Sequence, residues 1–405
     1  MNKRIIAAAA LVAGLFVHTQ GFTQVPISPS TGASTAADAT TMSEPEKAAR
    51  RTWRAVIRNT PVPAGGCFHV SYPNVAWERV ECKEAKPHVH HASRRPATPA
   101  PASVGDTNDY IAGVTEGLIT EAHGHFFISG VISETNVPGN LSPPGAITGP
   151  NEYSLQINTN RAYTPACAGH VNCTVWQQFI YSINSDCVLL VDCTPGLYMQ
   201  YWLYNWGTNC PSNWAHPAGD SVDCYTNSQT ISVPDIPVTE LGNVMLQGWA
   251  SPANGTDFND CVFLDYGGEW FNAVCAASVL DIGSVWTHAE FNVVGDLDST
   301  QANFNAGSQI TVQLGIDNIS NNVPPVCLLA SDVAASATYA GTWDTAETNN
   351  LTLGACQTGI GPVVNGPYSF DEPYIEFSET SAIPSTPCLS CGGGSPVPPP
   401  PPIEP

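Results

Sequence analysis

The sequence predicts an all-β protein: an antiparallel β-sandwich, stapled by disulfides and preceded by a mostly irregular N-terminal leader. Three observations support this prediction. Short β-branched and aromatic runs alternate in polarity between about residues 109 and 380, with Gly, Pro, Asn and Asp turn signals between them. Helical periodicity is almost absent from this region. The 14 cysteines fall into close sequential neighbours.

The candidate strands follow one another along the chain without a fixed repeat. Each run changes between apolar and polar residues at every second position, as a strand with one buried face does. About 270 residues is enough for one such sandwich with a sizeable core. The runs are HFFISGVIS (125–133), YSLQINT (153–159), TVWQQFIYSI (174–183), LYMQYWLYNW (197–206), NVMLQGWA (243–250), CVFLDYG (261–267), HAEFNVVG (288–295), QITVQLGI (309–316) and YIEFSE (374–379).

The first residues have the pattern of an export signal. Lys3 and Arg4 precede an apolar run over residues 5–17, which is typical of a signal peptide and short for a membrane span. No Cys follows the run, and no later stretch is apolar enough to span a membrane. We therefore expect a signal peptide over residues 1–24 and a secreted protein, extracellular or periplasmic, that has no membrane contact after export.

The cysteines indicate local disulfides in an oxidising compartment, because their number is even and their separations are short. Zinc is the alternative, but no paired Cys-x-x-Cys elements occur with His at ligand spacing, so we expect no metal and no cofactor. Spacing alone does not prove the connectivity. The sequential neighbours are Cys67 and Cys82, Cys167 and Cys173, Cys187 and Cys193, Cys210 and Cys224, Cys261 and Cys275, Cys327 and Cys356, and Cys388 and Cys391.

Charge divides the chain into two parts. Residues 1–95 carry twelve basic and six acidic side chains (net +6), whereas residues 96–405 carry one basic and 29 acidic (net −28). A cationic leader on an anionic body suggests a masking segment that binds the body, because the two attract while the carboxylates are ionised and separate once these protonate. A basic linker that aids solubility is the alternative. The negative body also argues against a nucleic-acid partner.

The domain boundaries follow changes in composition. The leader, residues 25–104, contains a basic amphipathic patch (47–58) and ends in a His/Pro-rich linker that cannot bury enough apolar surface to fold alone. Cleavage near Arg94 and Arg95 would remove almost every basic charge. The predicted sandwich spans residues 105–385. Residues 386–405 form a tail that is Gly-rich and then polyproline, which is typical of a spacer.

Polar residues at mid-strand positions suggest a binding groove. Glu290 lies inside a predicted strand, where alternation puts it on one face with His288. Gln177 and Gln178 are neighbours in another strand, so one faces each way and one can join the groove; the alternative is that such amides satisfy backbone groups in a wide sheet. A third strand alternates Gln with aromatic residues, which is too polar for a core and too aromatic for a surface. Its candidate groove residues are Tyr198, Gln200, Trp202, Tyr204 and Trp206.

These strands resemble the eqolisin family of glutamic peptidases. The match lies in AEFNVVGD around Glu290, preceded by an apolar-apolar-Gln strand (VWQ) and an aromatic strand (YWLYNW), and it spans roughly residues 120–315. The resemblance implies a concanavalin A-like, jelly-roll sandwich with a catalytic Glu and Gln on its concave sheet. The Glu falls on Glu290, and the Gln falls on Gln177 by simple alignment or on Gln178 if the register is offset by one.

The resemblance implies an acid-acting endopeptidase with a polypeptide substrate. Glu290 would be the general base for a water held against the Gln amide, and that amide would donate to the oxyanion. Two strands depart from the family pattern: SLQINTN (154–160) lacks the family's Trp and Asp, and YWLYNW lacks its acidic residue. The substrate-binding residues would be Gln200, Trp202, Tyr204, Trp206 and His288.

Two other functions fit the same residues. A lectin-like protein would bind glycans by stacking sugars on exposed aromatic rings. A glycoside hydrolase would need a second carboxylate facing Glu290, for which Glu269 and Asp265 are the candidates. The sequence contains no G-x-S-x-G elbow and no H-E-x-x-H zinc site, so serine and metallopeptidases are not favoured. The candidate glycan-stacking residues are Trp202, Tyr204, Trp206, Trp214 and Trp249.

Overall fold

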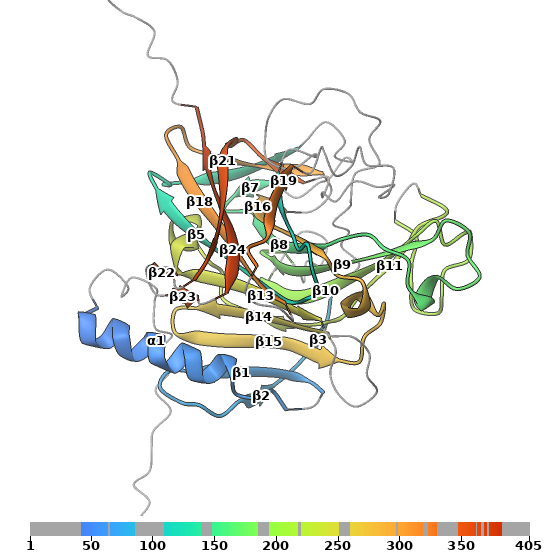
Figure 1. Cartoon of the computed structure of the whole chain (residues 1–405), viewed down its shortest axis with the longest axis horizontal. Coiled ribbons are helices and arrows are strands. Elements are labelled where there is room, and N and C mark those ends of the chain that lie inside the picture. The colour runs from blue at the N-terminus through green and yellow to red at the C-terminus, as the bar shows by residue number, and fades with distance from the viewer. Residues whose placement is uncertain are drawn as a thin grey trace, which may run out of the picture. The chain divides into compact units, whose positions relative to one another are not determined.

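The computed structural model in Figure 1 consists mainly of antiparallel β-strands. The predicted signal peptide and the tail lie outside the residues that it describes. The described residues are 42–63, 65–85, 109–138, 148–184, 194–217, 220–250, 260–296, 299–318, 323–329, 347–361, 363–365, 368–370 and 372–382.

Nine strands form one sheet, which we call sheet 1. They lie in the order β2-β1-β15-β14-β13-β5-β18-β24-β21, and every neighbouring pair is antiparallel. The strands are β1 (Cys67–Ser71), β2 (Glu78–Val80), β5 (Ile119–Ser129), β13 (Val244–Ala250), β14 (Asp260–Tyr266), β15 (Glu269–Ala276), β18 (Gln309–Asn318), β21 (Thr352–Ile360) and β24 (Pro373–Thr380).

A second antiparallel sheet, sheet 2, carries the residues of the predicted groove. Its strand order is β19-β4-β16-β8-β9-β10-β12-β3, and β11 also pairs with β10. The strands are β3 (Lys83–Glu84), β4 (Tyr110–Gly113), β8 (Tyr153–Thr159), β9 (Thr174–Ser182), β10 (Gly196–Tyr204), β11 (Cys224–Asn227), β12 (Gln229–Ser232), β16 (His288–Gly295) and β19 (Val326–Leu329).

The two sheets pack face to face around one hydrophobic core. Phe126 on β5 of sheet 1 stacks on Phe291 on β16 of sheet 2, with ring centroids 4.7 Å apart. The sheets approach so closely that a Cβ at Gly248 would lie 2.4 Å from the ring of Phe179, so glycine is needed at that position. The predicted all-β antiparallel sandwich is confirmed.

Smaller elements complete the described part of the chain. β17 (Thr300–Phe304) pairs with β6 (Glu134–Pro138) and with β20 (Thr348–Asn349), and β6 also pairs with β7 (Gly149–Pro150). β22 (Val363–Asn365) pairs with β23 (Tyr368–Phe370). Three short 3₁₀ helices cover Pro165–Cys167, Val238–Asn243 and Ile282–Ser284. No helix within the described ranges is long and apolar enough to cross a membrane.

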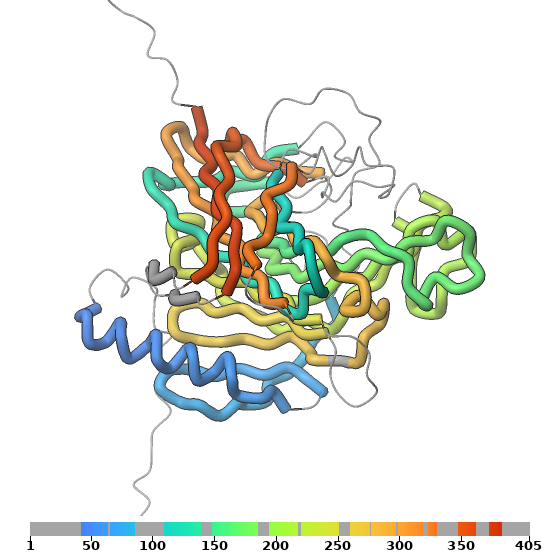
Figure 2. The backbone as a smooth tube through the Cα atoms, viewed as in Figure 1, coloured from blue at the N-terminus to red at the C-terminus, as the bar shows by residue number. Residues whose placement is uncertain are grey.

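The described part of the leader has regular structure. Its basic patch forms helix α1 (Glu44–Arg58), which begins at Ser43, whose hydroxyl caps the backbone N–H of Glu46. Residues beyond the helix contribute β1 and β2 to the edge of sheet 1 and β3 to the edge of sheet 2. Figure 2 shows the blue leader strands running beside the yellow β15. The expected boundary between leader and sandwich therefore does not separate the strands of the two sheets.

Helix α1 packs on the outer face of sheet 1. Trp53 and Ile57 are buried there against Met245, Phe263 and Trp270. A helix that is rich in Arg but carries an apolar stripe reaches stability through this packing, because propensity alone is marginal for a helix of this length.

Ion pairs join the same helix to the acidic body. Arg54 Nε lies 2.6 Å from a carboxylate oxygen of Asp265, which is fully buried. One Arg58 nitrogen lies 3.0 Å from Glu121 and 2.7 Å from Glu372. The basic charges of the leader thus meet acidic side chains of β14, of β5 and of the residue before β24.

Disulfides confirm the predicted local pairing for five of the seven neighbours. The bonds join Cys67 to Cys82, Cys167 to Cys173, Cys210 to Cys224, Cys261 to Cys275 and Cys327 to Cys356. The pairs formed by Cys187 with Cys193 and by Cys388 with Cys391 lie outside the described residues. The sequence separations of these bonds run from 6 to 29 residues, and the presence of disulfides agrees with an oxidising compartment.

Candidate functional site

Amide and carboxyl side chains cross the face of sheet 2 that points away from the core. On β16, Phe291 and Val293 belong to the core, so Glu290 points to the opposite face. The same alternation places Asn158 of β8 and Gln178 of β9 on that outer face, because the adjacent residues Ile157 and Phe179 belong to the core. The face was predicted from β9, β10 and β16; β8, which lies between β16 and β9, was not included.

Strand register aligns these side chains in one row across the sheet. Glu290 pairs with Asn158, Asn158 with Gln178, and Gln178 with Gln200. We call these four residues the polar row. Two strand spacings of about 4.8 Å place the Cα atoms of Glu290 and Gln178 about 10 Å apart.

Hydrogen bonds connect the polar row through its side chains. Asn158 Nδ2 donates to Glu290 Oε2 over 3.0 Å, and Gln178 Nε2 donates to Asn158 Oδ1 over 3.1 Å. Gln178 Nε2 also donates to Gln156 Oε1 over 3.0 Å. Trp202 Nε1 then donates to Gln200 Oε1 over 2.9 Å. Asn158 is therefore the link between the predicted acid and the predicted amide.

Gln177 lies on the other side of the same strand. Its amide nitrogen is 3.8 Å from Met199 Sδ, and the side chain also bonds to the carboxyl of Asp260 on β14 of sheet 1. Burial raises the pKa of Asp260 to about 7, although its hydrogen bonds to Ser278 and Gln177 oppose this shift. The structure brings Gln178, and not Gln177, to the face that carries Glu290.

A second acidic group lies next to the polar row. Asn292, two residues after Glu290 on β16, donates from Nδ2 to Asp109 Oδ2 and to Glu379 Oε1, both over 2.8 Å. Burial raises the pKa of Glu379 to about 8, so this carboxyl holds a proton at neutral pH. Sequence reasoning missed Asn158, Asp109 and Glu379; Asn158 and Glu379 carry a sequence signal, because they are polar residues inside the predicted strands 153–159 and 374–379, whereas Asp109 does not.

The polar row is closed to solvent in the full-length chain. Glu290 is 3% exposed, and Gln178 is fully buried. A carboxyl at such a position needs hydrogen-bond partners, because a buried charge without them is costly. The bond from Asn158 to Glu290 supplies one of them.

The aromatic residues beside the row pack on one another. The Trp202 ring stacks on Tyr204 and on Tyr225, with centroids 5.3 Å away in each case. The Arg161 guanidinium lies 3.6 Å from the centroid of Tyr204, a cation–π contact. Trp202 is only 1% exposed, so this cluster offers no open ring to a sugar.

Trp206 is not part of this cluster. Strand β10 ends at Tyr204, and Asn205 has a φ of 55°, so strand alternation no longer fixes the direction of the next side chain. The Trp206 ring instead stacks on His170 at 3.4 Å. The expectation that Trp206 lines the same strand face was wrong for this physical reason.

His288 lies at the start of β16, two residues from Glu290. Its Nδ1 is 2.8 Å from the hydroxyl of Thr287. Burial lowers the pKa of His288 to about 4, so the ring is neutral over most of the pH range. At neutral pH this imidazole can donate or accept a hydrogen bond, and it becomes cationic only below about pH 4.

Neither expected partner for a glycosidase mechanism lies near Glu290 in the sheet order. Asp265 and Glu269 belong to β14 and β15 of sheet 1, and Asp265 is paired with Arg54. The lone group of potential metal ligands in the described part of the chain is Cys210, His216 and Cys224. Its two sulfurs are bonded to each other in a disulfide, so they are not thiolate ligands.

Comparison with known proteins does not assign this chain to a family. No protein-family model matches it, and no curated protein matches its sequence.

Proposed function

We propose that this protein is a secreted, acid-acting glutamic endopeptidase of the eqolisin type, in which Glu290 is the general base and Gln178 stabilises the oxyanion. One observation carries the proposal: Glu290 and Gln178 share one strand face and are joined through the side chain of Asn158. A carboxyl and an amide on the same rigid face, about two strand spacings apart, could hold one water between them once the Asn158 side chain no longer bridges them.

The chemistry assigns each residue one role. Glu290 takes a proton from a water as its oxygen attacks the peptide carbonyl, and later gives that proton to the leaving amine. Gln178 Nε2 donates to the oxyanion of the tetrahedral intermediate, exchanging one of its present acceptors, Gln156 or Asn158, for the substrate. Asn158 orients the Glu290 carboxyl through the bond to Oε2 and is a positioning residue.

Acidic working conditions fit the charge of the body. Residues 96–405 carry 29 acidic and one basic side chain, and protonation relieves their mutual repulsion. The five described disulfides fit an oxidising compartment and support export. Because the polar row is buried in the full-length chain, substrate access requires that this closed state open, as in a precursor that acid activates.

The aromatic cluster gives less support to glycan binding. Trp202 is almost fully buried and already stacked on Tyr204 and Tyr225. A sugar would have to displace those contacts before it could reach the ring.

The test is casein digestion by the full-length protein before and after incubation at about pH 3.5, near the pKa of carboxyl groups. Glu290→Gln keeps an oxygen for Asn158 and should fold normally, but it should lower kcat by about 100-fold or more because an amide cannot accept the proton. The matched control is Glu269→Gln on sheet 1, which should keep full activity. Casein cleavage that persists in folded Glu290→Gln would overturn the proposal, and so would absence of cleavage by the unaltered protein at every acidic pH tested.

A further inference from the structure

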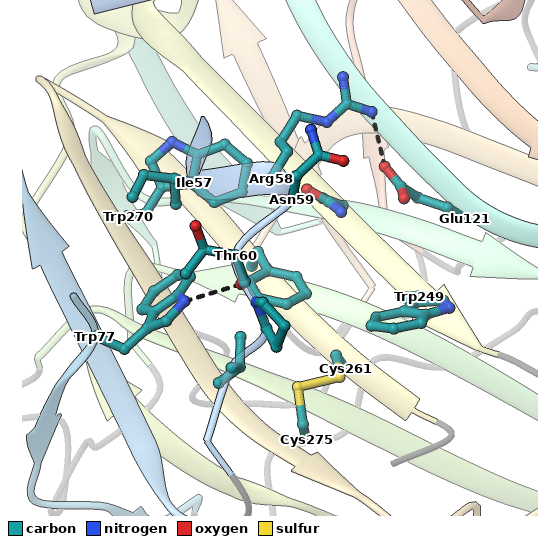
Figure 3. Close-up of a pocket in the computed structure, with 14 residues that line it drawn as sticks. Ile57, Arg58, Asn59, Thr60, Trp77, Glu121, Trp249, Cys261, Trp270 and Cys275 are labelled. Atoms are coloured by element: carbon teal, nitrogen blue, oxygen red, sulfur yellow. Dashed lines mark hydrogen bonds and ion pairs between the residues drawn. A yellow bond between two sulfur atoms is a disulfide. The ribbon is translucent and has the colours of Figure 1, made fainter. Parts of the chain in front are cut away.

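A pocket of about 430 Å³ lies against the outer face of sheet 1, the sheet that does not carry the polar row (Figure 3). The body supplies Trp249 of β13, Phe263 of β14 and Trp270 of β15. The leader supplies the end of α1 and Trp77. In Figure 3, Trp77 and Trp249 lie on opposite sides of the pocket, and the Cys261–Cys275 disulfide lies between them.

The aromatic residues of the pocket differ in exposure. Phe263 and Trp270 are buried and form part of its floor. Trp249 is 38% exposed, although its strand neighbours are buried. Grooves lined by exposed aromatic rings recognise proline-rich segments in the polyproline II conformation, because the flat pyrrolidine rings pack against them at low entropic cost.

Polar groups in the pocket are left for a ligand. Gln247 is only 5% exposed, yet its side-chain oxygen accepts no hydrogen bond from any residue that the structure describes. The Trp77 N–H is satisfied by the Thr60 carbonyl over 3.2 Å, whereas the Trp249 N–H has no partner among the described residues. A ligand with a carbonyl acceptor near Trp249 and an N–H donor near Gln247 would form hydrogen bonds with the Trp249 N–H and with the side-chain oxygen of Gln247.

The chain itself contains a segment with that chemistry. Residues 395–405 read SPVPPPPPIEP, with an unbroken run of proline from Pro398 to Pro402. Prolines supply carbonyl acceptors without N–H donors, and Val397 supplies an N–H between two of them. The run favours polyproline II, at about 3.1 Å per residue.

The segment has enough chain to reach the pocket. The last described residue is Ala382, and residues 383–394 separate it from Ser395. Twelve residues span up to about 40 Å when extended. The pocket lies three strands from β24 in sheet 1, a distance of about 15 Å across the sheet, plus up to about 25 Å along the strands. A tether of this length would give an effective concentration in the millimolar range, so weak docking is sufficient.

We propose that residues 395–405 dock in this pocket as a polyproline II segment, with Trp249 as the stacking anchor and Gln247 as the hydrogen-bonding residue. Because the end of α1 and Trp77 form one wall, the docked segment would contact the leader and the body at the same time. The proposal is independent of peptidase activity, since it involves the opposite side of the sandwich.

The experiment uses full-length protein labelled with 5-fluorotryptophan, in which the fluorine NMR signal of Trp249 is assigned with Trp249→Phe. Replacing Pro398 to Pro402 by Ser in the full chain should shift the Trp249 signal, and adding the synthetic peptide SPVPPPPPIEP to that variant should restore it. A Trp249→Ala substitution in the Ser-replaced chain should weaken peptide affinity by about tenfold or more, as loss of an aromatic anchor does. The matched control, Tyr163→Ala, removes a ring that is 61% exposed outside the pocket and should not change affinity.

Two results would overturn the proposal. If the Trp249 signal is the same with and without the proline run, this segment does not occupy the pocket. If the signal is the same but the added peptide binds, the pocket is a site for a proline-rich partner and not for the chain's own segment.

Discussion

At the scale of single residues, neighbours in one strand have different roles. Gln177 and Gln178 are adjacent, yet one bonds across the core to Asp260 and the other joins the polar row. The sequence predicts that they face opposite ways, because side chains alternate along a strand. It does not tell which one faces the groove, since that depends on the register, which is set by contacts such as that of Phe179 with Gly248 in the other sheet.

Separate Gln178→Ala and Gln177→Ala substitutions should therefore have different effects. Gln178→Ala should lower kcat for casein by about 100-fold, as loss of an oxyanion donor does. It should also lower the free energy of unfolding by about 1–3 kcal/mol, because the buried hydrogen bonds to Gln156 and Asn158 are lost. Gln177→Ala should keep kcat and lower the free energy of unfolding by about 1–3 kcal/mol, because a buried hydrogen bond to Asp260 is lost. Steady-state kinetics and urea unfolding measure the two quantities. Equal and mild effects of both substitutions would contradict the assigned roles.

At the scale of elements, the leader differs most from the sequence prediction. The basic amphipathic patch was recognisable, but the pairing of β1 with β15 and of β3 with β12 was not. β1 pairs with a strand about 200 residues away, and β3 has only two residues, Lys83–Glu84, so neither periodicity nor turn signals reveal their partners. By contrast, the five described disulfides were predictable because each joins sequential neighbours.

The buried ion pair of α1 gives a prediction for this element. Arg54→Ala should lower the free energy of unfolding by about 3–5 kcal/mol, because it leaves the buried carboxyl of Asp265 without its cation. Arg51→Ala on the same helix makes the same change in net charge at a partly exposed position and should cost less than about 0.5 kcal/mol. Chemical unfolding of both variants measures the difference. Equal losses would show that the attachment of α1 depends on overall charge and not on this pair.

As the pH falls, the end of α1 should lose protection from hydrogen exchange before sheet 2 does. Burial raises the pKa of Glu121 and of Glu372, but contacts with His123 and Arg58 outweigh it and hold both pKa values below the ordinary range. A carboxyl whose pKa is lower in the folded protein than in the unfolded chain stabilises the fold at a pH above the unfolded-state pKa. This stabilisation is lost as the pH falls below about 4.5. Hydrogen exchange at residues 48–58, corrected for intrinsic rates, should therefore increase relative to β9 between about pH 6 and pH 3.

The double variant Glu121→Gln, Glu372→Gln is the control for this exchange experiment. It removes both titrating groups that Arg58 contacts. Protection of α1 from exchange should therefore be weaker at about pH 6 and should change less between about pH 6 and pH 3. The same experiment examines the expected masking role of the leader. If α1 keeps its protection relative to β9 down to about pH 3, the leader remains attached in acid and its charge is not a release mechanism.

At the scale of the whole molecule, the sequence predicted the fold class but not the layout of the groove. Alternating runs, turn signals and cysteine spacing together indicated an antiparallel sandwich with local disulfides. The order of strands in each sheet is set by long-range pairing, so the sequence could not show that β8 lies between β16 and β9. Asn158 therefore enters the site only with the structure.

Buried carboxyls across the molecule predict how its stability depends on pH. Burial is the main cause of the raised pKa values of several buried carboxyls, and it raises the pKa to about 8 for Glu134 and Glu379 and to about 7 for Asp260 and Asp296. A raised folded pKa means that the folded state binds protons more tightly than the unfolded chain does. The stabilisation is complete below the unfolded pKa, near 4, and is lost as the pH rises through about 7 to 8.

Two buried histidines oppose this trend only at lower pH. Burial lowers the pKa of His125 and of His288, so their neutral forms stabilise the fold above about pH 6.5 and cost stability below it. Between about pH 8.5 and 6.5 the carboxyls outweigh this opposition, which begins only as the pH approaches 6.5, so the free energy of unfolding should rise as the pH falls through that window. Thermal unfolding at matched ionic strength should show a higher Tm at about pH 6.5 than at pH 8.5.

Replacing one of these carboxyls separates their effect from general charge repulsion. Glu379→Gln keeps an acceptor for Asn292 but cannot ionise, so the dependence of Tm on pH in this window should become shallower. Glu116→Gln removes an exposed carboxylate from the same anionic body and should leave the slope almost unchanged. Equal slopes in both variants and the unaltered protein would mean that the slope comes from net charge alone. A slope that becomes shallower in Glu379→Gln but not in Glu116→Gln would instead identify the burial of carboxyls such as Glu379 as the reason why this fold is more stable at the lower pH.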